Sequence, residues 1–201
     1  MNKRETVFRA IACGYIEGKR SFTQLALSRD LDTSLSIING AVTDLESINA
    51  VRVKPRSFEV IALDRLLMYW ATHRNLKKDI VYQTRVNATV KDIEKSMPDS
   101  VAFTGYTAYR FLFNEAPADY SEVYLYATET GLKEIKRRFE TSDMVPNLIV
   151  LKCDGNMEKA IEGHNLKGSS VCAAQLFVDL WNMNQWYAKD FVEALARRLG
   201  I

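Results

Sequence analysis

A Gly-Ser pair followed by a lone aspartate in an apolar run is the part of this sequence that comes nearest to catalytic chemistry. The stretch reads Gly168-Ser-Ser-Val-Cys-Ala-Ala-Gln-Leu-Phe-Val-Asp179, with nine residues between Ser169 and Asp179. Nucleotidyltransferases place a metal-binding carboxylate after a Gly-Ser pair in this manner. Two-metal nucleotidyl transfer, however, needs two carboxylates close enough to hold a pair of Mg²⁺ ions. A second carboxylate therefore decides whether this stretch could be catalytic.

The second carboxylate is missing from the position where the pattern requires it. Residues two apart share one face of a strand, so the partner of Asp179 would stand at position 181. Trp181 occupies that position, and an indole cannot ligate Mg²⁺. Between His164 and Asp190, Asp179 is the sole acidic residue of the sequence. We expect no catalytic or metal-binding role, although a carboxylate brought close by folding, from Asp154 or Asp190, would restore a nucleotidyltransferase-like enzyme as the alternative.

A structural role for the same stretch follows from its apolar character. We expect Val171–Val178 to pack as a strand in a sheet, with Asp179 capping the C-terminal helix or holding a loop. The sequence contains no Gly-rich phosphate loop, no His-Glu-x-x-His helix and no Ser-His-Asp set that can be placed. We therefore expect neither enzymatic activity nor a cofactor.

The cysteines give no sign of a disulfide framework. Cys13, Cys153 and Cys172 lie far apart, and no pair has Cys-x-x-Cys spacing. A nucleophilic cysteine needs a base beside it, and the only histidines, His73 and His164, fall in no recognisable motif. An odd, sparse set of cysteines is typical of a reducing compartment. These observations predict buried thiols and a cytoplasmic protein.

Composition and charge bound the class of protein. The 201 residues are 47% apolar and 26% charged, which is ordinary for a globular protein, and no apolar run approaches the length of a membrane span. Glu5 and Arg9 interrupt the first apolar stretch, which argues against a signal peptide. Residues 1–78 hold 13 Lys or Arg against 8 Asp or Glu, a net charge of +5, whereas residues 79–201 hold 14 against 17, a net charge of −3. The first region therefore favours a polyanionic partner.

The elements of the first region occur in the order of a winged helix-turn-helix domain. Helices are expected over residues 3–18, over 21–28 with Leu25 and Ala26 facing inward, and from a cap at Asp32 or Thr33 to about Ser47. Leu35, Ile38, Val42 and Leu45 form the apolar stripe of this third helix. Alternating apolar and polar residues on both sides of Pro55 predict a basic hairpin over 51–61, and residues 64–77 a connector helix.

This order predicts a DNA-binding surface on residues 1–78. The third helix would enter the major groove with its polar face, and the hairpin would contact phosphate or the minor groove as a wing. A winged helix can also be a protein-docking module without DNA contact, which remains the alternative. The predicted DNA-binding residues are Thr23, Thr33, Ser34, Ser36, Asn39, Thr43, Arg52, Lys54 and Arg56.

The second region, residues 79–201, is expected to be an α/β domain with a small, partly parallel sheet, which makes the whole chain α+β. A strand over 121–127, a helix over 130–139 and a strand over 146–152 suggest a βαβ unit with parallel strands. Residues 80–88 are expected to form a strand or an extended linker. Helices are also expected over 90–97, from about Tyr106, and over 182–199. Lys136, Arg137 and Arg138 end one of these helices and are interpreted as a solvated cluster that complements the helix dipole.

Four short stretches of the second region follow in the order seen in a known family. They are GYTAYRFL from Gly105, SEVYLY from Ser121, VCAAQLFVDL from Val171 and AKDFVEAL from Ala188. This pattern resembles the AbiEi-like antitoxin and transcriptional-regulator family of type IV toxin–antitoxin systems, and the resemblance covers nearly the whole chain. It implies an N-terminal winged helix joined to a C-terminal α/β domain, in which the Asp-Leu pair closes a strand.

The resemblance also implies a function. Such a protein represses its own operon, with DNA contacts on the third helix and the wing, and is sometimes paired with a nucleotidyltransferase-like toxin. The chain departs from the family in its FVEAL stretch, where a Glu-Ala-Ala stretch is usual, and in the short remainder of its last helix. These departures put the antitoxin role in question more than the fold. We predict double-stranded DNA as the partner; a cognate toxin encoded nearby and a homodimer stay open, and no membrane partner is expected.

Overall fold

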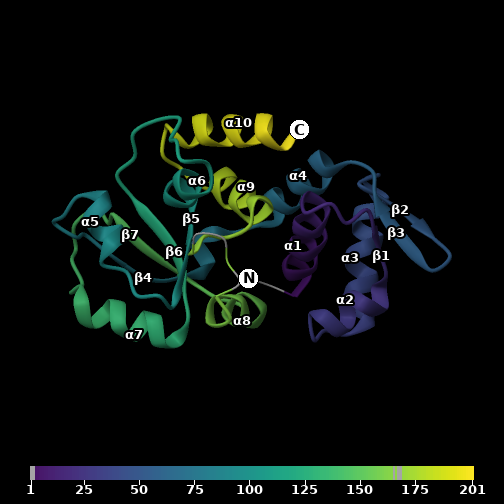
Figure 1. Ribbon diagram of the computed structural model, residues 1–201, viewed down its shortest axis with the longest axis horizontal. Coiled ribbons are helices and arrows are strands. Elements are labelled where there is room, and N and C mark those ends of the chain that lie inside the picture. The colour runs from purple at the N-terminus through teal and green to yellow at the C-terminus, as the bar shows by residue number, and fades with distance from the viewer. Residues whose placement is uncertain (1–2, 165, 167–168) are drawn as a thin grey trace.

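The computed structural model describes residues 3–164, 166 and 169–201, and it is a mixed α+β protein. In its first half a small antiparallel sheet with strand order β1-β3-β2 lies against three helices (Figure 1). The elements of this half are α1 (Lys3–Ile16), β1 (Ser21–Phe22), α2 (Gln24–Asp30), α3 (Leu35–Ser47), β2 (Val51–Lys54), β3 (Ser57–Val60) and α4 (Leu63–His73).

Aromatic and aliphatic side chains hold these elements together. Ile11 of α1 and Ile38 of α3 are fully buried, and the rings of Phe22 and Phe58 stack at 5.6 Å across the β1–β3 pair. The expected hairpin is confirmed, with β2 and β3 joined through Pro55-Arg56. The expected helix from Ser21 is wrong at its start. Ser21 and Phe22 form β1, because Phe22 fills the core while Thr23 caps α2.

The second half contains a four-stranded sheet with strand order β4-β7-β6-β5. Strands β6 and β7 are parallel and joined through α7, and the other pairs are antiparallel, so the predicted βαβ unit and the partly parallel sheet are confirmed. The elements are a 3₁₀ turn η1 (Leu76–Asp79), β4 (Ile80–Thr84), α5 (Val90–Lys95), β5 (Val101–Thr104), α6 (Gly105–Phe113), β6 (Val123–Ala127), α7 (Glu129–Arg138), β7 (Leu148–Lys152), α8 (Gly155–Glu162), α9 (Ala173–Trp181) and α10 (Ala188–Leu199).

One helix of the second half was predicted as a strand. The run expected to pack in a sheet, Val171–Val178, mostly lies in α9, and its residues 174–180 are buried on all sides. A short apolar run without periodicity fits a buried strand and a buried helix equally well, and here the helix forms. The last helix begins at Ala188, six residues after the expected start at Asn182.

Helix α9 joins the two halves of the molecule. It packs against α1 and α4 of the first half and against α6 and α10 of the second, and Figure 1 shows it between the two groups of elements. Buried side chains form one continuous core through both halves. The expected boundary near residue 78 stays a prediction, because this shared core does not separate two units.

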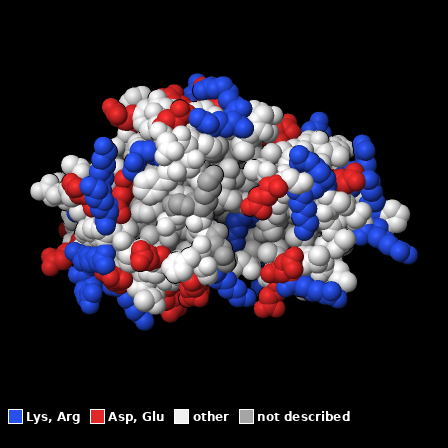
Figure 2. All heavy atoms as spheres, viewed as in Figure 1, with Lys and Arg blue, Asp and Glu red and all other residues white. Residues whose placement is uncertain are grey.

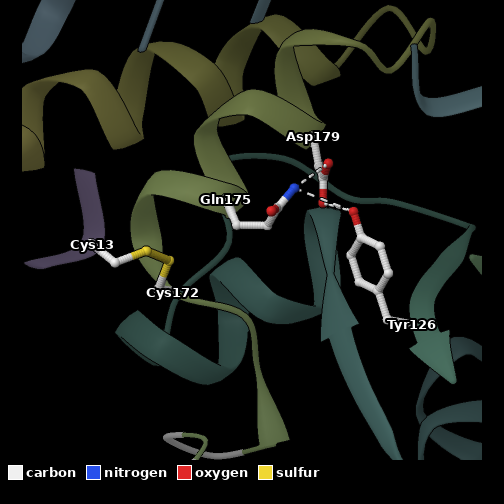
Figure 3. Close-up of a disulfide and its surroundings, with 5 residues drawn as sticks. All are labelled: Cys13, Tyr126, Cys172, Gln175 and Asp179. Carbon is white, nitrogen blue, oxygen red and sulfur yellow. Dashed lines mark hydrogen bonds between the residues drawn. A yellow bond between two sulfur atoms is a disulfide. The ribbon is translucent and has the colours of Figure 1, made fainter. Parts of the chain in front are cut away.

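A disulfide also crosses between the halves, which corrects the expectation of three free thiols. Cys13 of α1 is bonded to Cys172, the residue before α9, with a Cα–Cα distance of 6.2 Å (Figure 3). The two cysteines are 159 residues apart, so no local spacing in the sequence indicates the bond. Cys153 is free and half-buried. The cysteine pattern therefore no longer supports a reducing compartment.

Over the part of the chain that the structure describes, no helix combines the length and the apolar composition that crossing a bilayer requires.

Candidate nucleic-acid interface

The buried face of α3 decides which of its polar residues point outward. Ile38, Ala41, Val42 and Leu45 are buried, which leaves the opposite face to solvent. The sequence predicted that Leu35 belongs to this buried stripe. In the structure Leu35 is exposed, and Ala41 is buried in the stripe. Three of the predicted DNA contacts lie exposed on the outer face, namely Ser36, Asn39 and Thr43.

The side chain of Asn39 accepts one long hydrogen bond from the neighbouring helix α2. Gln24 of α2 donates from Nε2 to Asn39 Oδ1 at 3.3 Å, at an exposed position. The amide nitrogen of Asn39 points away from this contact as an available donor, since an amide carries an acceptor and two donors on opposite sides. Such an amide can pair with N6 and N7 of adenine once its hydrogen bond with Gln24 is broken. Helices α2 and α3 thus present two linked amides at one surface.

Two other predicted contacts begin helices. The Oγ1 atom of Thr23 accepts from the backbone N–H of Ala26 at 3.2 Å and caps α2, while Ser34 Oγ accepts from the N–H of Ile37 at 3.4 Å and caps α3. Ser34 is therefore the cap that the sequence assigned to Asp32 or Thr33. Both caps are exposed, and the N-terminus of a helix attracts anions.

Thr33 lies differently from its predicted neighbours. It precedes the cap of α3, it is half-buried, and its carbonyl accepts from Ser28 Oγ at 2.7 Å. It lines a hollow against Asp154 and Asn156 at the start of α8. This position separates Thr33 from the outer face of α3.

Two leucines that were expected in the core are exposed. Leu25 is 50% exposed and Leu35 is 48% exposed, whereas Leu27 provides the core contact of α2. Side chains on a helix point back toward its N-terminus, so the first residue of α3 extends past the core that the following turns cover. These two leucines add apolar surface near the polar residues of α2 and α3.

The β2–β3 hairpin exposes all three of its predicted cationic residues. Arg52, Lys54 and Arg56 are exposed, while Phe58 faces the core. Lys54 forms an ion pair with Glu59, which also faces Arg52 across the strand pair. The hairpin keeps a net charge of +2, from three cations and one carboxylate. Figure 2 shows Lys and Arg side chains at the end of the molecule where Figure 1 has this hairpin.

The opposite end of α3 carries acidic groups that limit the positive surface. Asp44 binds Arg4 of α1 at 2.8 Å, and Glu46 is exposed one residue before the end of the helix. The cationic surface therefore lies on the hairpin, and the outer face of α3 is close to neutral.

The second candidate for chemistry, Asp179, lies in the interior. It is fully buried in α9, and its carboxylate accepts from Thr104 Oγ1 and the Tyr126 hydroxyl, both at 2.8 Å. Gln175 Nε2 donates at 2.9 Å and Arg74 Nε at 3.3 Å. Figure 3 shows the amide of Gln175 and the hydroxyl of Tyr126 directed at this carboxylate. The prediction that Asp179 caps a helix or holds a loop is wrong, because α9 continues past it.

Arg74 is the centre of this buried network. It is 4% exposed and pairs with Asp179, with Asp79 and, at 3.4 Å, with Glu5 Oε2. Burial alone would lower the pKa of the Arg74 guanidinium, but Tyr126, Asp179 and Asp79 together raise that pKa above its ordinary value. Burial and the charge of Asp179 raise the pKa of Tyr126 well above its usual range, so its hydroxyl keeps its proton. Sequence reasoning missed Arg74, since no local pattern connects it with Asp179.

The carboxylates that could have joined Asp179 in a metal site are elsewhere. Asp190 is exposed on α10, and Asp154 pairs with Arg9 at 2.7 Å. Across residues 3–164, 166 and 169–201, no group of three His, Cys, Asp or Glu side chains is arranged to hold a metal ion. Gly168 of the Gly-Ser pair lies outside the described residues. The cation that neutralises Asp179 in this fold is Arg74.

Comparison with protein-family models, with curated proteins and with solved structures finds no match to this chain. The resemblance to the AbiEi-like family therefore stays a prediction from the sequence.

Proposed function

We propose that residues 1–78 form a winged helix-turn-helix domain that binds duplex DNA, and that the protein regulates transcription, as a repressor. The order α1, β1, α2, α3, β2, β3 with sheet order β1-β3-β2 supports this proposal, because it places a three-helix core beside a hairpin wing. The observation that carries it is the joint exposure of Ser36, Asn39 and Thr43 on α3 and of Arg52 and Arg56 on the hairpin.

The outer face of α3 and the β2–β3 hairpin would have different roles in DNA binding. Small polar side chains on α3 can reach base edges in the major groove and so distinguish sequences. The hairpin cations would neutralise phosphates, which supplies affinity without reading the sequence. The near-neutral face of α3 and the basic hairpin fit this division, and the net charge of +5 on residues 1–78 favours the approach to a polyanion.

A protein-docking winged helix without DNA contact is the second candidate. It is favoured by the exposed Leu25 and Leu35, which place apolar surface beside α3, and by Glu59, which reduces the charge of the hairpin. The role of antitoxin, with a toxin as partner, rests only on the sequence resemblance and is a narrower form of the regulator proposal.

The salt dependence of DNA affinity tests the proposal. Fluorescence anisotropy with the duplex upstream of the protein's own gene should give an affinity that falls with salt, with a slope of log affinity against log salt near −0.9 for each phosphate contact. The double variant Arg52→Ala/Arg56→Ala should flatten this slope by about one to two units.

A matched control removes the same charge from another surface. Lys133 and Arg137 are exposed on α7, and the double variant Lys133→Ala/Arg137→Ala should leave the slope unchanged. An equal loss in both double variants would mean that only the net charge matters. Affinity without salt dependence in the unmodified protein would rule out the hairpin as a phosphate contact.

A further inference from the structure

The disulfide between Cys13 and Cys172 borders two hollows beside α1 and the start of α9. Both cysteines line a hollow of about 380 Å³, whose wall is mostly apolar, and also a neighbouring hollow of about 200 Å³. Both residues are half-buried and pack against the edge of the shared core. In Figure 3 the bond bridges α1 and the first turn of α9. A small molecule can therefore approach this bond while the chain stays folded.

The two cysteines lie at opposite ends of helix dipoles. Cys172 is the N-cap of α9, and its side chain makes no capping hydrogen bond. The first N–H groups of a helix have no intrahelical partner and stabilise a negative charge, which for a cysteine is a thiolate. Cys13 lies in the last turn of α1, where the carbonyl groups carry the negative end of the dipole. The helix ends therefore favour a negative charge on the sulfur of Cys172 over one on the sulfur of Cys13.

The charged side chains around the bond do not reverse this preference. Glu17 follows Cys13 by one turn and borders the larger hollow, where its carboxylate disfavours a second negative charge. Arg9 borders the smaller hollow, but its ion pair with Asp154 at 2.7 Å neutralises its charge. Among the residues that the structure describes, Glu17 and Arg9 are the only charged ones in the two walls. The sulfur of Cys172 is thus the better place for a negative charge.

We propose that this disulfide is a thiol-exchange site, which a small thiol such as glutathione opens and Cys172 closes again. The thiolate of the small molecule attacks the sulfur of Cys13, the S–S bond breaks, and its electron pair leaves on the sulfur of Cys172. Exchange is faster when the leaving sulfur is the more stable thiolate, which selects Cys172 for this role. Cys13 then carries a mixed disulfide, and attack by the thiolate of Cys172 on the sulfur of Cys13 expels the small thiol and restores the bond.

A second small thiol completes the reduction. Its thiolate attacks the outer sulfur of the mixed disulfide, and Cys13 leaves and takes a proton. Two small thiols thus become one disulfide, while the protein gains two electrons and two protons as two thiols, and α1 is no longer bonded to the start of α9. Cys153 takes no part, because burial and the carboxylates of Asp154 and Glu158 raise the pKa of its thiol to about 12, so that it stays protonated at neutral pH.

Reduction of the folded protein by glutathione tests the site, and the result does not depend on DNA binding. After incubation with excess reduced glutathione, free thiols are blocked with iodoacetamide, and peptide mass mapping follows Cys13 and Cys172. The folded protein should lose the bond at a rate within about tenfold of the rate in urea, where access is complete. Slower reduction than this would show an inert structural bond and overturn the proposal. The glutathione adduct should be found on Cys13, and an adduct on Cys172 alone would overturn the assigned roles.

Two matched variants compare the two sulfur atoms directly. In a Cys153→Ser background, Cys13→Ser leaves only the thiol of Cys172, and Cys172→Ser leaves only the thiol of Cys13, so both variants lose the same bond. The thiol of Cys172 should react with dithiodipyridine at neutral pH at least about tenfold faster than the thiol of Cys13. Circular dichroism shows whether both variants keep the fold, and if either does not, the position of the glutathione adduct in the unmodified protein decides the question. Equal rates in two folded variants, or a faster reaction of Cys13, would overturn the assigned roles.

Discussion

Helices α3 and α9 both carry polar side chains among apolar ones, yet the fold uses these side chains in opposite ways. On α9, residues 174–180 are all buried, and Gln175 and Asp179 bind each other and two elements of the second half. On α3, Ser36, Asn39 and Thr43 are exposed and face away from the core. The comparison shows that the partners of a polar residue, more than its type, decide whether it is available to a ligand.

The difference has an energetic reason. A buried carboxylate costs several kcal/mol unless a cation and hydrogen bonds compensate it, as Arg74, Thr104 and Tyr126 do for Asp179. An exposed Asn or Ser costs almost nothing and stays free for contacts in solution. The polar groups of α9 are thus fixed by the interior, and those of α3 stay accessible at the surface.

The largest expected effect comes from removing Arg74 from its buried ion pairs with Asp79 and Asp179. Arg74→Ala removes the cation that pairs with Asp179 and Asp79, and we expect the free energy of unfolding to fall by about 3–5 kcal/mol. Urea denaturation followed by circular dichroism measures this change. The double variant Arg74→Met/Asp179→Leu removes both charges of the pair and should be less destabilised than Arg74→Ala. A single variant within about 0.5 kcal/mol of the unmodified protein would show that the network contributes nothing to stability.

Neighbouring residues of α3 should separate folding from recognition. Ile38 is fully buried, and Ile38→Ala should cost about 2–5 kcal/mol of stability through the cavity that it leaves. Asn39→Ala, one residue on, should change stability by less than about 0.5 kcal/mol but weaken binding to the specific DNA site by about 1–3 kcal/mol.

Random DNA provides the control for this pair. Non-specific affinity rests on phosphates, so Asn39→Ala should weaken it far less than affinity for the specific site. An equal loss on both DNAs, with an unchanged melting temperature, would mean that Asn39 positions the helix and does not read a base.

The same contrast explains what the sequence could and could not predict. The amphipathic stripe of α3 and the alternating residues of the hairpin are periodic, so the burial of Ile38 and Phe58 and the exposure of Asn39 and Arg56 follow from spacing. Helix α9 is apolar on all sides and has no period, so it was mistaken for a strand. The contacts of Asp179 with Arg74, and the bond between Cys13 and Cys172, join residues far apart in sequence, and only the assembled fold brings them together.

The smallest expected effect concerns Leu35, which the sequence pattern places in the buried stripe of α3 although the residue is exposed. Leu35 is 48% exposed at the start of α3, so Leu35→Ala should change the free energy of unfolding by less than about 0.5 kcal/mol. If the helix enters the major groove, this side chain can contact a thymine methyl group, and its loss should weaken specific binding by about 1 kcal/mol. Replacing thymine by uracil, which lacks that methyl group, in the duplex should weaken the unmodified protein and leave Leu35→Ala unaffected. Normal DNA binding by Leu35→Ala would contradict this contact and would leave the exposed side chain of Leu35 without a role in DNA binding.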